Sequence, residues 1–496
     1  MPIFSNMIEV QDNIVGYLNT QLAVASELAK NYTTDPATGG KFLYRPIYYR
    51  LFKAVSNFVK PEGVESRLII IPGLRGVGKT TLLFQIFERF QNAKNTKFLY
   101  LSCDRLVEFG VGLQEVLSVY ENKFLGGPLE TYKGKLILLI DEAHYDKSWS
   151  LVIKTVYDRS KNVMILVSGS SAIAFGMTTD LVRRAKTEWL FPLRFMEYVL
   201  FKSAKTKNII YPPAHTADNL QNALFLTHSA NEAYSKLVGV IKETRTQYLS
   251  KIPSLQSDIE QYMLLRGFPF TISEVDESVL YEKTLDILRR VIEEDLPLFS
   301  DVGKKTISKA FSILSSIACN KGGGVSIKSI AANFSDISET SVFRLFEGLE
   351  KAGVLFPVKP YGGPEKIANA AWKYYFATPV LQAALMWRIG KLDKTSETLG
   401  PLLETSVANT LWRINVLQSR IISGLYYDYK KGGADFIAKT PNGLVVIESG
   451  WGDKPSRQVK QTMESVSAYM GIIISGSAEK INENMITLPK EIMLLA

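Results

Sequence analysis

The first 200 residues alternate between short apolar runs and longer stretches with helical spacing. The apolar runs at 68–71, 98–101, 136–140 and 163–167 are typical of buried parallel strands. After the first run, apolar residues recur at helical spacing, at Leu82, Leu83, Ile86, Phe87 and Phe90. This alternation predicts an α/β fold in which helices flank a parallel sheet.

The pattern along the rest of the chain predicts further regions. We place a core at residues 41–201, after an N-terminal extension at 1–40. Residues 202–300 are expected to form a helical lid. Residues 301–380 contain three helix patterns and a strand, and residues 381–496 contain a β-hairpin around an Asn-Gly turn. A chain of 496 residues is expected to form about three domains.

The composition is that of a globular protein without a membrane-spanning segment. Hydrophobic residues make up 46% of the chain and charged residues 22%. The apolar runs stay far below the ~18 residues that a membrane helix needs. Glu9 and Asp12 interrupt any secretory signal, and the two cysteines are Cys103 and Cys319. We therefore expect a cytoplasmic protein with no membrane partner and no disulfide framework.

The chain has a formal net charge of +9, and its basic residues are scattered rather than gathered in one tract. This charge makes DNA a candidate partner through its phosphates, without assigning it. His144, His215 and His228, together with two distant cysteines, offer no zinc-binding spacing. Any bound metal is therefore expected to be magnesium with oxygen ligands.

A glycine-rich segment lies between the first predicted strand and the helix that follows it. It matches the phosphate-binding pattern G-x-x-x-x-G-K-[ST] at every fixed position. Its residues are Gly73, Leu74, Arg75, Gly76, Val77, Gly78, Lys79, Thr80 and Thr81. Backbone N–H groups and the helix N-terminus are expected to bind the phosphates of ATP, with Lys79 on the β- and γ-phosphates and Thr80 on Mg²⁺. A chance glycine-rich turn is the alternative.

Two carboxylates, Asp141 and Glu142, follow the apolar run 136–140. Asp141 is expected to hold magnesium, directly or through water. Glu142 is expected to take a proton from the attacking water, a step that contributes typically ~10²- to 10⁴-fold. A polar cap of the next helix is the alternative. The letters Asp-Glu-Ala-His at 141–144 are also those of a helicase motif, but no companion helicase motifs follow in order.

Hydroxyl groups end the next predicted strand, and a basic pair follows. Ser168 and Ser170 are both eligible as polar sensors of the γ-phosphate, and ordinary turn chemistry is the alternative. Arg183 and Arg184 precede a strand-like segment at 189–191. One of them would stabilise transition-state charge at a neighbouring subunit's nucleotide, which requires a homo-oligomer. A solvated basic pair is the alternative.

Taken in order, these segments resemble those of a known family. The series comprises the P-loop, Asp141–Glu142, Ser168–Ser171, Arg183–Arg184 and the segment 191–197. It is similar to the AAA-like archaeal and bacterial P-loop ATPases, and the segments that strengthen the likeness lie at 266–269, 372–376, 378–379 and 400–407. The resemblance covers most of the chain from about residue 40 onward. It implies an ATPase of the AAA+ type with a winged-helix region and a C-terminal restriction-endonuclease-like domain of unknown function.

The region 301–380 resembles a winged helix, with helix patterns at 304–319, 326–334 and 338–352 before a strand at 354–358. The charged residues of its third helix are Glu339, Glu347, Glu350, Arg344 and Lys351. A net acidic helix reads DNA poorly, because phosphate contacts dominate affinity. We therefore favour packing or partner contact for this region over direct DNA reading.

The last region resembles a degenerate PD-(D/E)XK nuclease. Asp435 and Glu448 lie on the predicted hairpin, and Glu404 lies on a preceding helix. In that fold such carboxylates hold magnesium, and a lysine two positions after the Glu assists the nucleophile. Gly450 occupies that position here. The candidate substitutes are Lys431 and Lys454. We favour a non-catalytic nucleic-acid or assembly platform over active cleavage.

The function expected from the sequence is that of a Mg²⁺-dependent ATPase that remodels or regulates a partner as a homo-oligomer. The partner is expected to be a protein or DNA. Two alternatives stay open. One is an ATP-gated DNA-processing protein, and the other is a nucleotide-binding assembly scaffold without useful turnover.

Overall fold

The computed structural model describes residues 2–36, 38–60, 66–174, 176–206, 208–320, 326–334, 336–476 and 478–496. The chain divides into two compact units. Unit 1 comprises Met1–Phe191 with Lys351–Gly353, and unit 2 comprises Pro192–Glu350 with Val354–Ala496.

Unit 1 is built on a five-stranded sheet with the order β2-β3-β4-β1-β5, in which all neighbouring strands are parallel. The strands are β1 (Leu68–Pro72), β2 (Thr96–Ser102), β3 (Lys135–Asp141), β4 (Val163–Gly169) and β5 (Lys186–Thr187). β1 and β4 are buried throughout, because helices cover both faces of the sheet. The predicted α/β class with a parallel sheet is confirmed.

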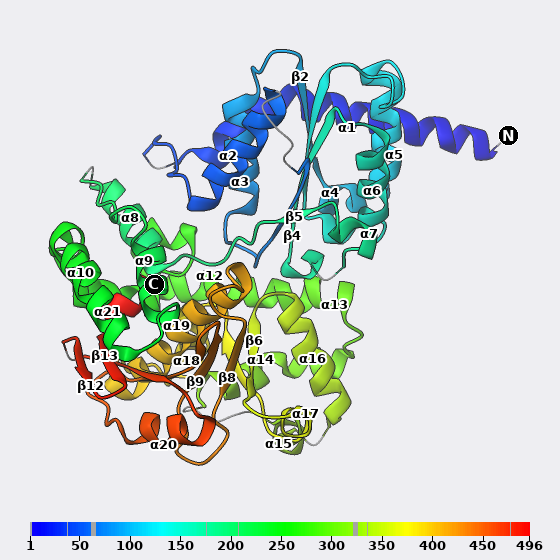
Figure 1. The fold of residues 1–496 in the computed structure, drawn as a ribbon. Helices are drawn as coiled ribbons and strands as arrows, with labels where there is room; N and C mark the ends of the chain where they lie inside the picture. The colour runs from blue at the N-terminus through cyan, green and yellow to red at the C-terminus, as the bar shows by residue number, and fades with distance from the viewer. Residues whose placement is uncertain are drawn as a thin grey trace. The chain divides into compact units, whose positions relative to one another are not determined.

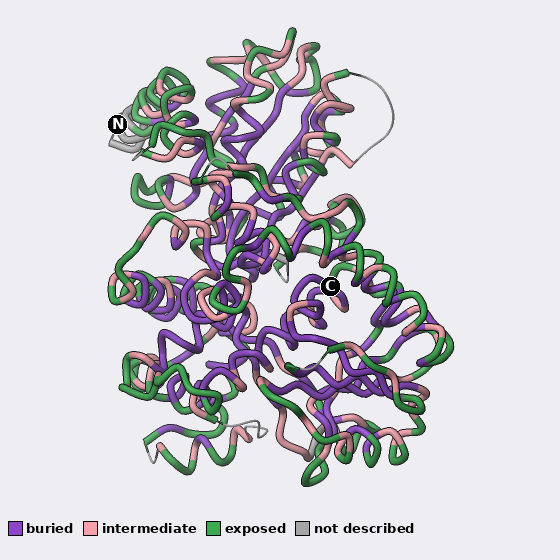
Figure 2. The backbone as a smooth tube through the Cα atoms, turned by 90° about the vertical axis from the view of Figure 1, so that its left-hand side faces the viewer, coloured by how far each residue is buried: buried purple, intermediate pink, exposed green. Residues whose placement is uncertain are grey.

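The helices of unit 1 lie on both sides of this sheet, with α2 and α3 on one side and α4 to α7 on the other (Figure 1). They are α1 (Pro2–Thr33), α2 (Pro46–Val59), α3 (Lys79–Phe90), α4 (Cys103–Glu108), α5 (Leu113–Tyr120), α6 (Trp149–Arg159) and α7 (Thr179–Val182). Figure 2 shows the strands between them as buried. The arrangement places the loops after β1, β3 and β4 at the same edge of the sheet.

Helix α1 belongs to the core of unit 1. It contacts the edge strand β2, and also α3 and α5. Ile14 and Leu18 are buried in the main hydrophobic cluster of the unit. Tyr32, at the other end of the helix, stacks on Phe84 of α3 with ring centroids 4.9 Å apart. The first helix therefore helps to hold the sheet together.

The predicted strand at 189–191 is displaced. The short fifth strand is Lys186–Thr187, which pairs with β1. The chain beyond it still follows β1, because the Glu188 amide donates to the Ile70 carbonyl and the Leu190 amide to the Pro72 carbonyl. The prediction of a strand at 189–191 is wrong in position, since the paired residues come earlier in the chain.

Unit 2 contains an eight-stranded mixed sheet with the order β12-β13-β11-β10-β9-β8-β6-β7. Its strands are β6 (Leu355–Pro360), β7 (Lys373–Phe376), β8 (Gly424–Tyr427), β9 (Phe436–Thr440), β10 (Gly443–Ser449), β11 (Met470–Ser475), β12 (Lys480–Asn482) and β13 (Met485–Pro489). β9 and β10 form the predicted antiparallel hairpin. β6 pairs antiparallel with β7 and parallel with β8, so the strands of residues 301–380 continue the sheet of residues 381–496.

Helices make up the rest of unit 2. Those before the sheet are α8 (Phe195–Lys205), α9 (Thr216–Phe225), α10 (Ala230–Gln247), α11 (Leu255–Leu264), α12 (Glu277–Arg290), α13 (Leu296–Phe299), α14 (Lys304–Ala318), α15 (Ile327–Asn333) and α16 (Glu339–Lys351). Those within or after it are α17 (Pro364–Asn369), α18 (Pro379–Arg388), α19 (Ser396–Leu417), α20 (Arg457–Val466) and α21 (Lys490–Met493). Among the described residues, none of these helices, nor any in unit 1, has the length and apolar character that crossing a bilayer requires.

Candidate active site

The glycine-rich loop joins the buried end of β1 to the first turn of α3. Gly76 and Gly78 have φ angles of 80° and 96°, in the left-handed region that glycine adopts at little cost. Gly73 is needed for a different reason, because a Cβ atom there would collide with the Leu190 carbonyl oxygen. α3 begins at Lys79, and its first N–H groups have no acceptor inside the helix. The loop therefore has the backbone that an anion-binding turn requires.

Lys79 lies inside this loop and is only 4% exposed. Its ammonium donates to the carbonyl oxygens of Gly73 at 3.1 Å and Leu74 at 3.4 Å. It also lies 3.6 Å from Oε1 of Glu142. The loop thus holds a buried positive charge beside its main-chain amides, and that charge can move from these carbonyls to phosphate oxygens.

Asp141 ends β3 beside the first turn of α3. The Thr80 hydroxyl donates to Asp141 Oδ2 at 2.6 Å, and the Ser168 hydroxyl at the end of β4 donates to Oδ1. Burial raises the pKa of Asp141 and the negative charge of Glu142 raises it further, whereas the hydrogen bonds from Ser168 and Thr80 lower it. The parallel sheet therefore brings Thr80, Asp141 and Ser168 together, although they come from three separate segments.

Glu142 has a left-handed backbone, with φ of 49°, and its Oε1 lies 3.6 Å from the Lys79 ammonium of the loop. Its Oε2 lies 3.4 Å from His144 Nδ1. The same nitrogen accepts a hydrogen bond of 3.2 Å from the Ser170 amide. The His144 ring therefore lies between Glu142 and Ser170.

The remaining predicted loop residues have distinct places. The Val77 carbonyl accepts a hydrogen bond of 3.0 Å from Arg45, and Thr81 lies in the first turn of α3. Ser170 is 2% exposed, and its hydroxyl has no hydrogen-bond partner among the described residues. That hydroxyl is thus available to a ligand, whereas the Ser168 hydroxyl is used by Asp141.

The two predicted arginines differ in their surroundings. Arg184 donates to Asp158 Oδ1 at 2.8 Å and to the Asp180 carbonyl at 2.7 Å. Arg183 is exposed at the end of α7 and makes no hydrogen bond or ion pair with any residue that the structure describes. Among the described residues, neither arginine makes a hydrogen bond or ion pair with the P-loop of its own chain. Of the two, Arg183 is the one whose guanidinium is not engaged by a residue that the structure describes.

Two residues near the loop were missed from the sequence. The phenol of Tyr100 in β2 donates to Asp141 Oδ2 at 3.2 Å. Arg45, just before α2, donates to the carbonyl oxygens of Val77 at 3.0 Å and Phe191 at 2.9 Å. Tyr100 lies on a predicted strand, so the meeting of parallel strand ends placed it at this edge of the sheet, but its contact with Asp141 depends on the pairing of β2 with β3. No sequence pattern marks Arg45.

The residues present fit ATP with magnesium. Hydroxyl and carboxylate oxygens are the ligands that Mg²⁺ prefers, and Thr80 and Asp141 supply one of each, 2.6 Å apart. The buried ammonium of Lys79 and the open amides at the start of α3 suit a polyphosphate. No sulfur or imidazole group is needed for either ligand.

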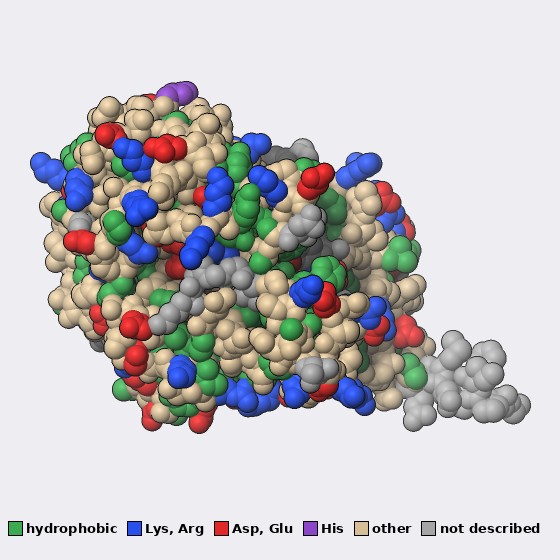
Figure 3. Space-filling model, turned by 90° about the horizontal axis from the view of Figure 1, so that it is seen from below, with side chains coloured by type: hydrophobic (Ala, Val, Ile, Leu, Met, Phe, Trp, Pro, Cys, Tyr) green, Lys and Arg blue, Asp and Glu red, His purple; other side chains and the backbone are tan. Residues whose placement is uncertain are grey.

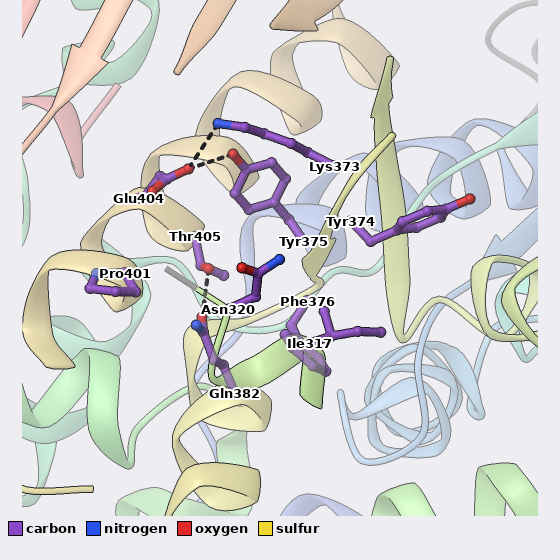
Figure 4. Close-up of a pocket in the computed structure, with 10 residues that line it drawn as sticks. All are labelled: Ile317, Asn320, Lys373, Tyr374, Tyr375, Phe376, Gln382, Pro401, Glu404 and Thr405. Carbon is purple, nitrogen blue, oxygen red and sulfur yellow. Dashed lines mark hydrogen bonds and ion pairs between the residues drawn. The ribbon is translucent and has the colours of Figure 1, made fainter. Parts of the chain in front are cut away.

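A second cluster of charged residues lies in unit 2. Glu404 of α19, Asp435 just before β9 and Glu448 of β10 come together with Lys373 of β7. Lys373 Nζ lies 3.6 Å from Glu404 Oε1 and 3.8 Å from Asp435 Oδ1, and the Asp435 amide donates to Glu448 Oε2 at 3.1 Å. Figure 4 shows Lys373 and Tyr375 both directed at Glu404, beside a cavity of about 30 Å³. The cluster thus contains its own cation.

Lys454 completes this cluster. Its ammonium donates to Glu448 Oε1 at 3.0 Å. Gly450 makes room for this approach, because a Cβ atom at that position would collide with the Lys454 side chain. Burial and the charge of Asp435 raise the pKa of Glu448, Lys454 lowers it, and the balance is a pKa of about 7. Lys431 is exposed and stays outside the cluster.

Metal binding does not fit this second cluster. Among the residues that the structure describes, no group of three or more His, Cys, Asp and Glu side chains is arranged to hold a metal ion. Two lysine ammoniums already neutralise most of the charge of the three carboxylates. The arrangement is therefore that of a buried ion-pair network.

Comparisons with known proteins agree with the first site. Residues 65–199 match the family model described as an AAA domain. The chain is also 33% identical over 436 residues to the "Uncharacterized protein MJ1637" of Methanocaldococcus jannaschii, which covers 88% of this chain and 86% of that protein. The chain belongs to the MJ1637 family. Unit 1 of this family member therefore carries an AAA-type P-loop ATPase domain.

Other similarities are more distant. The "Uncharacterized protein MJ1544" of the same organism is 27% identical over 157 residues, or 31% of this chain and 33% of that protein. Thermotoga maritima RuvB, a Holliday junction branch migration motor, is 15% identical with a TM-score of 0.27, over 63% of this chain and 89% of RuvB. AMPPCP-bound DnaA from Aquifex aeolicus is 15% identical with a TM-score of 0.26, over 62% and 90%.

Proposed function

We propose that this chain is a Mg²⁺-dependent ATPase that binds ATP in the P-loop Gly73–Thr81 and hydrolyses it with Glu142. One observation carries the proposal. The Thr80 hydroxyl of α3 donates to Asp141 at the end of β3 at 2.6 Å, and the ammonium of Lys79 lies 3.6 Å from Glu142 beside them. An anion-binding lysine, a metal-binding hydroxyl and two acids thus meet at one edge of the sheet.

Each residue has a chemical task in this proposal. Lys79 and the main-chain amides of the loop bind and orient the phosphates. Thr80 and Asp141 would hold the magnesium ion, which supplies positive charge to the phosphate oxygens when it is bound. Glu142 takes a proton from the attacking water, and the free hydroxyl of Ser170 contacts the γ-phosphate.

We also propose that the chain forms a homo-oligomer in which an arginine acts on the neighbouring subunit's nucleotide. Arg183 is preferred over Arg184 as the residue that acts on a neighbouring subunit's nucleotide, because Arg184 is held by Asp158 at 2.8 Å. An exposed arginine that acts in trans requires a homo-oligomer. We propose that ATP turnover in this oligomer remodels or regulates a partner.

The test is an ATPase assay on the full chain with and without magnesium, combined with a mass measurement by light scattering with and without ATP. The proposal expects Mg²⁺-dependent phosphate release that rises with assembly. A chain that forms stable particles but releases no phosphate, with or without candidate partners, would instead support the scaffold alternative.

We propose that unit 2 serves partner contact, with residues 202–300 as a helical lid, 301–380 as a winged-helix-like region and 381–496 as a non-cleaving nuclease-like domain. Lys373 and Lys454 pair with the carboxylates Glu404, Asp435 and Glu448, where a nuclease of this fold would bind its metal ion. These ion pairs support the absence of cleavage. On the face in Figure 3, acidic side chains lie among the basic ones, so this face gives no separate support for DNA. Cleavage of plasmid or single-stranded DNA with Mg²⁺ or Mn²⁺, lost on Asp435→Ala, would favour the DNA-processing alternative.

A further inference from the structure

The carboxylate of Asp141 accepts four hydrogen bonds, and one donor lies outside every sequence motif. Thr80 donates to Oδ2 at 2.6 Å, while Ser168 and the Glu142 amide donate to Oδ1. The fourth donor is the phenol of Tyr100 in β2, 3.2 Å from Oδ2. A carboxylate has about four lone-pair sites, so protein donors occupy all of them.

Packing fixes the place of this phenol. The Tyr100 ring lies 4.5 Å from the ring of Phe84 in α3, measured between centroids. Phe84 in turn stacks on Tyr32 of α1, at 4.9 Å and an interplanar angle of 4°. The phenol oxygen lies 3.2 Å from Asp141 Oδ2. Tyr100 is therefore a donor that is held by rings from two helices.

We propose that Tyr100 is a positioning residue of the magnesium site, which holds Asp141 Oδ2 where it accepts the proton of Thr80. With its proton directed at Asp141, Thr80 presents its lone pairs to the ion. Because protein donors fill the carboxylate, Asp141 would help to hold the ion by orienting Thr80 and not by direct coordination. This inference rests on the proposed function, since it assumes that Thr80 and Asp141 serve a nucleotide-bound magnesium ion.

The experiment compares Tyr100→Phe with wild type in the full chain. This substitution keeps the ring that packs on Phe84 and removes one hydrogen-bond donor. The matched control is Tyr120→Phe, because Tyr120 is also a buried tyrosine of unit 1, in its main hydrophobic cluster. Binding of N-methylanthraniloyl-ATP is followed by fluorescence anisotropy, first in EDTA and then along a Mg²⁺ titration. Thermal unfolding of each variant shows whether it is folded.

The expected result is that Tyr100→Phe raises the Mg²⁺ midpoint about three- to tenfold, the range that corresponds to one lost hydrogen bond. Nucleotide affinity in EDTA stays unchanged, and Tyr120→Phe behaves as wild type in both conditions. An unchanged Mg²⁺ midpoint would overturn the inference. So would an equal loss of affinity in EDTA and in Mg²⁺, because Tyr100 would then support the loop in general. A wild type without Mg²⁺-dependent nucleotide binding would refute the proposed function itself.

Discussion

Replacing Glu142 by glutamine separates ATP binding from ATP hydrolysis. The substitution keeps the size of the side chain and removes its ability to take a proton from water. Loss of a general base costs typically ~10²- to 10⁴-fold in rate, which corresponds to about 3 to 5 kcal/mol in the barrier. We expect turnover to fall by that factor.

The structure also predicts the effect on binding. Glu142 lies 3.6 Å from the ammonium of Lys79, and its charge raises the pKa of Asp141. Glutamine removes the attraction that draws Lys79 away from phosphate and the repulsion of the incoming triphosphate. We therefore expect the affinity for Mg²⁺-ATP in Glu142→Gln to equal that of wild type or to exceed it by up to about tenfold, since about 1.4 kcal/mol corresponds to a factor of ten.

Phosphate release under single-turnover conditions measures the first effect, and fluorescent nucleotide binding measures the second. Glu130→Gln is the control, because Glu130 is an exposed acid of the same unit whose partner is Arg159 at 2.6 Å. Its rate should match that of wild type, because an exposed ion pair contributes little. Hydrolysis in Glu142→Gln within twofold of wild type would show that another group takes the proton.

Three further predictions concern other residues. Arg183→Ala should lower turnover of the assembled protein by ~10³-fold or more, whereas Arg184→Ala should lose its contacts with Asp158 and the Asp180 carbonyl and keep its turnover; turnover measured against protein concentration tests this, and equal losses would remove the preference for Arg183. Ser170→Ala should reduce turnover about tenfold at unchanged nucleotide affinity, as one lost hydrogen bond predicts, and a loss of affinity alone would contradict it. Burial raises the pKa of Glu448 from 4.5 to about 7, so the stability that this group contributes is present below pH 4.5 and is lost as the pH rises to about 7. Denaturant unfolding at pH 5 and pH 8 should thus show wild type losing up to about 3 kcal/mol that Glu448→Gln retains, and parallel pH profiles would contradict it.

The sequence was sufficient for those features that depend on local spacing. The strand at 136–140 was predicted from its apolar run. Because the carboxyl ends of parallel strands lie at the same edge of a sheet, Asp141 was expected beside the P-loop. The hairpin of β9 and β10 followed in the same way from its alternating residues and Asn-Gly turn. Such features are local, because each is determined by residues within one or two elements.

Features that depend on which elements meet could not be predicted. Helix α1 lies outside the family resemblance, yet Ile14 and Leu18 are part of the core of unit 1. The contact of Tyr100 with Asp141 depends on the position of β2 next to β3 and on the rings that hold the phenol. Lys373 reaches the carboxylates of unit 2 only because β7 joins the far end of a mixed sheet. The residues in each of these contacts lie far apart in the sequence, and no local pattern predicts that they meet.

The central claim is that Lys79 binds the phosphates of ATP, and the affinity of Lys79→Ala for Mg²⁺-ATP tests it most directly. Lys135→Ala is the matched control, because Lys135 is also a lysine of unit 1 that donates to two main-chain carbonyls, of Phe58 and Val59 at 2.7 Å each. The account predicts a loss of at least about tenfold for Lys79→Ala, as expected for charge-assisted hydrogen bonds, and wild-type affinity for a folded Lys135→Ala. Unchanged nucleotide affinity in a folded Lys79→Ala protein would contradict the claim.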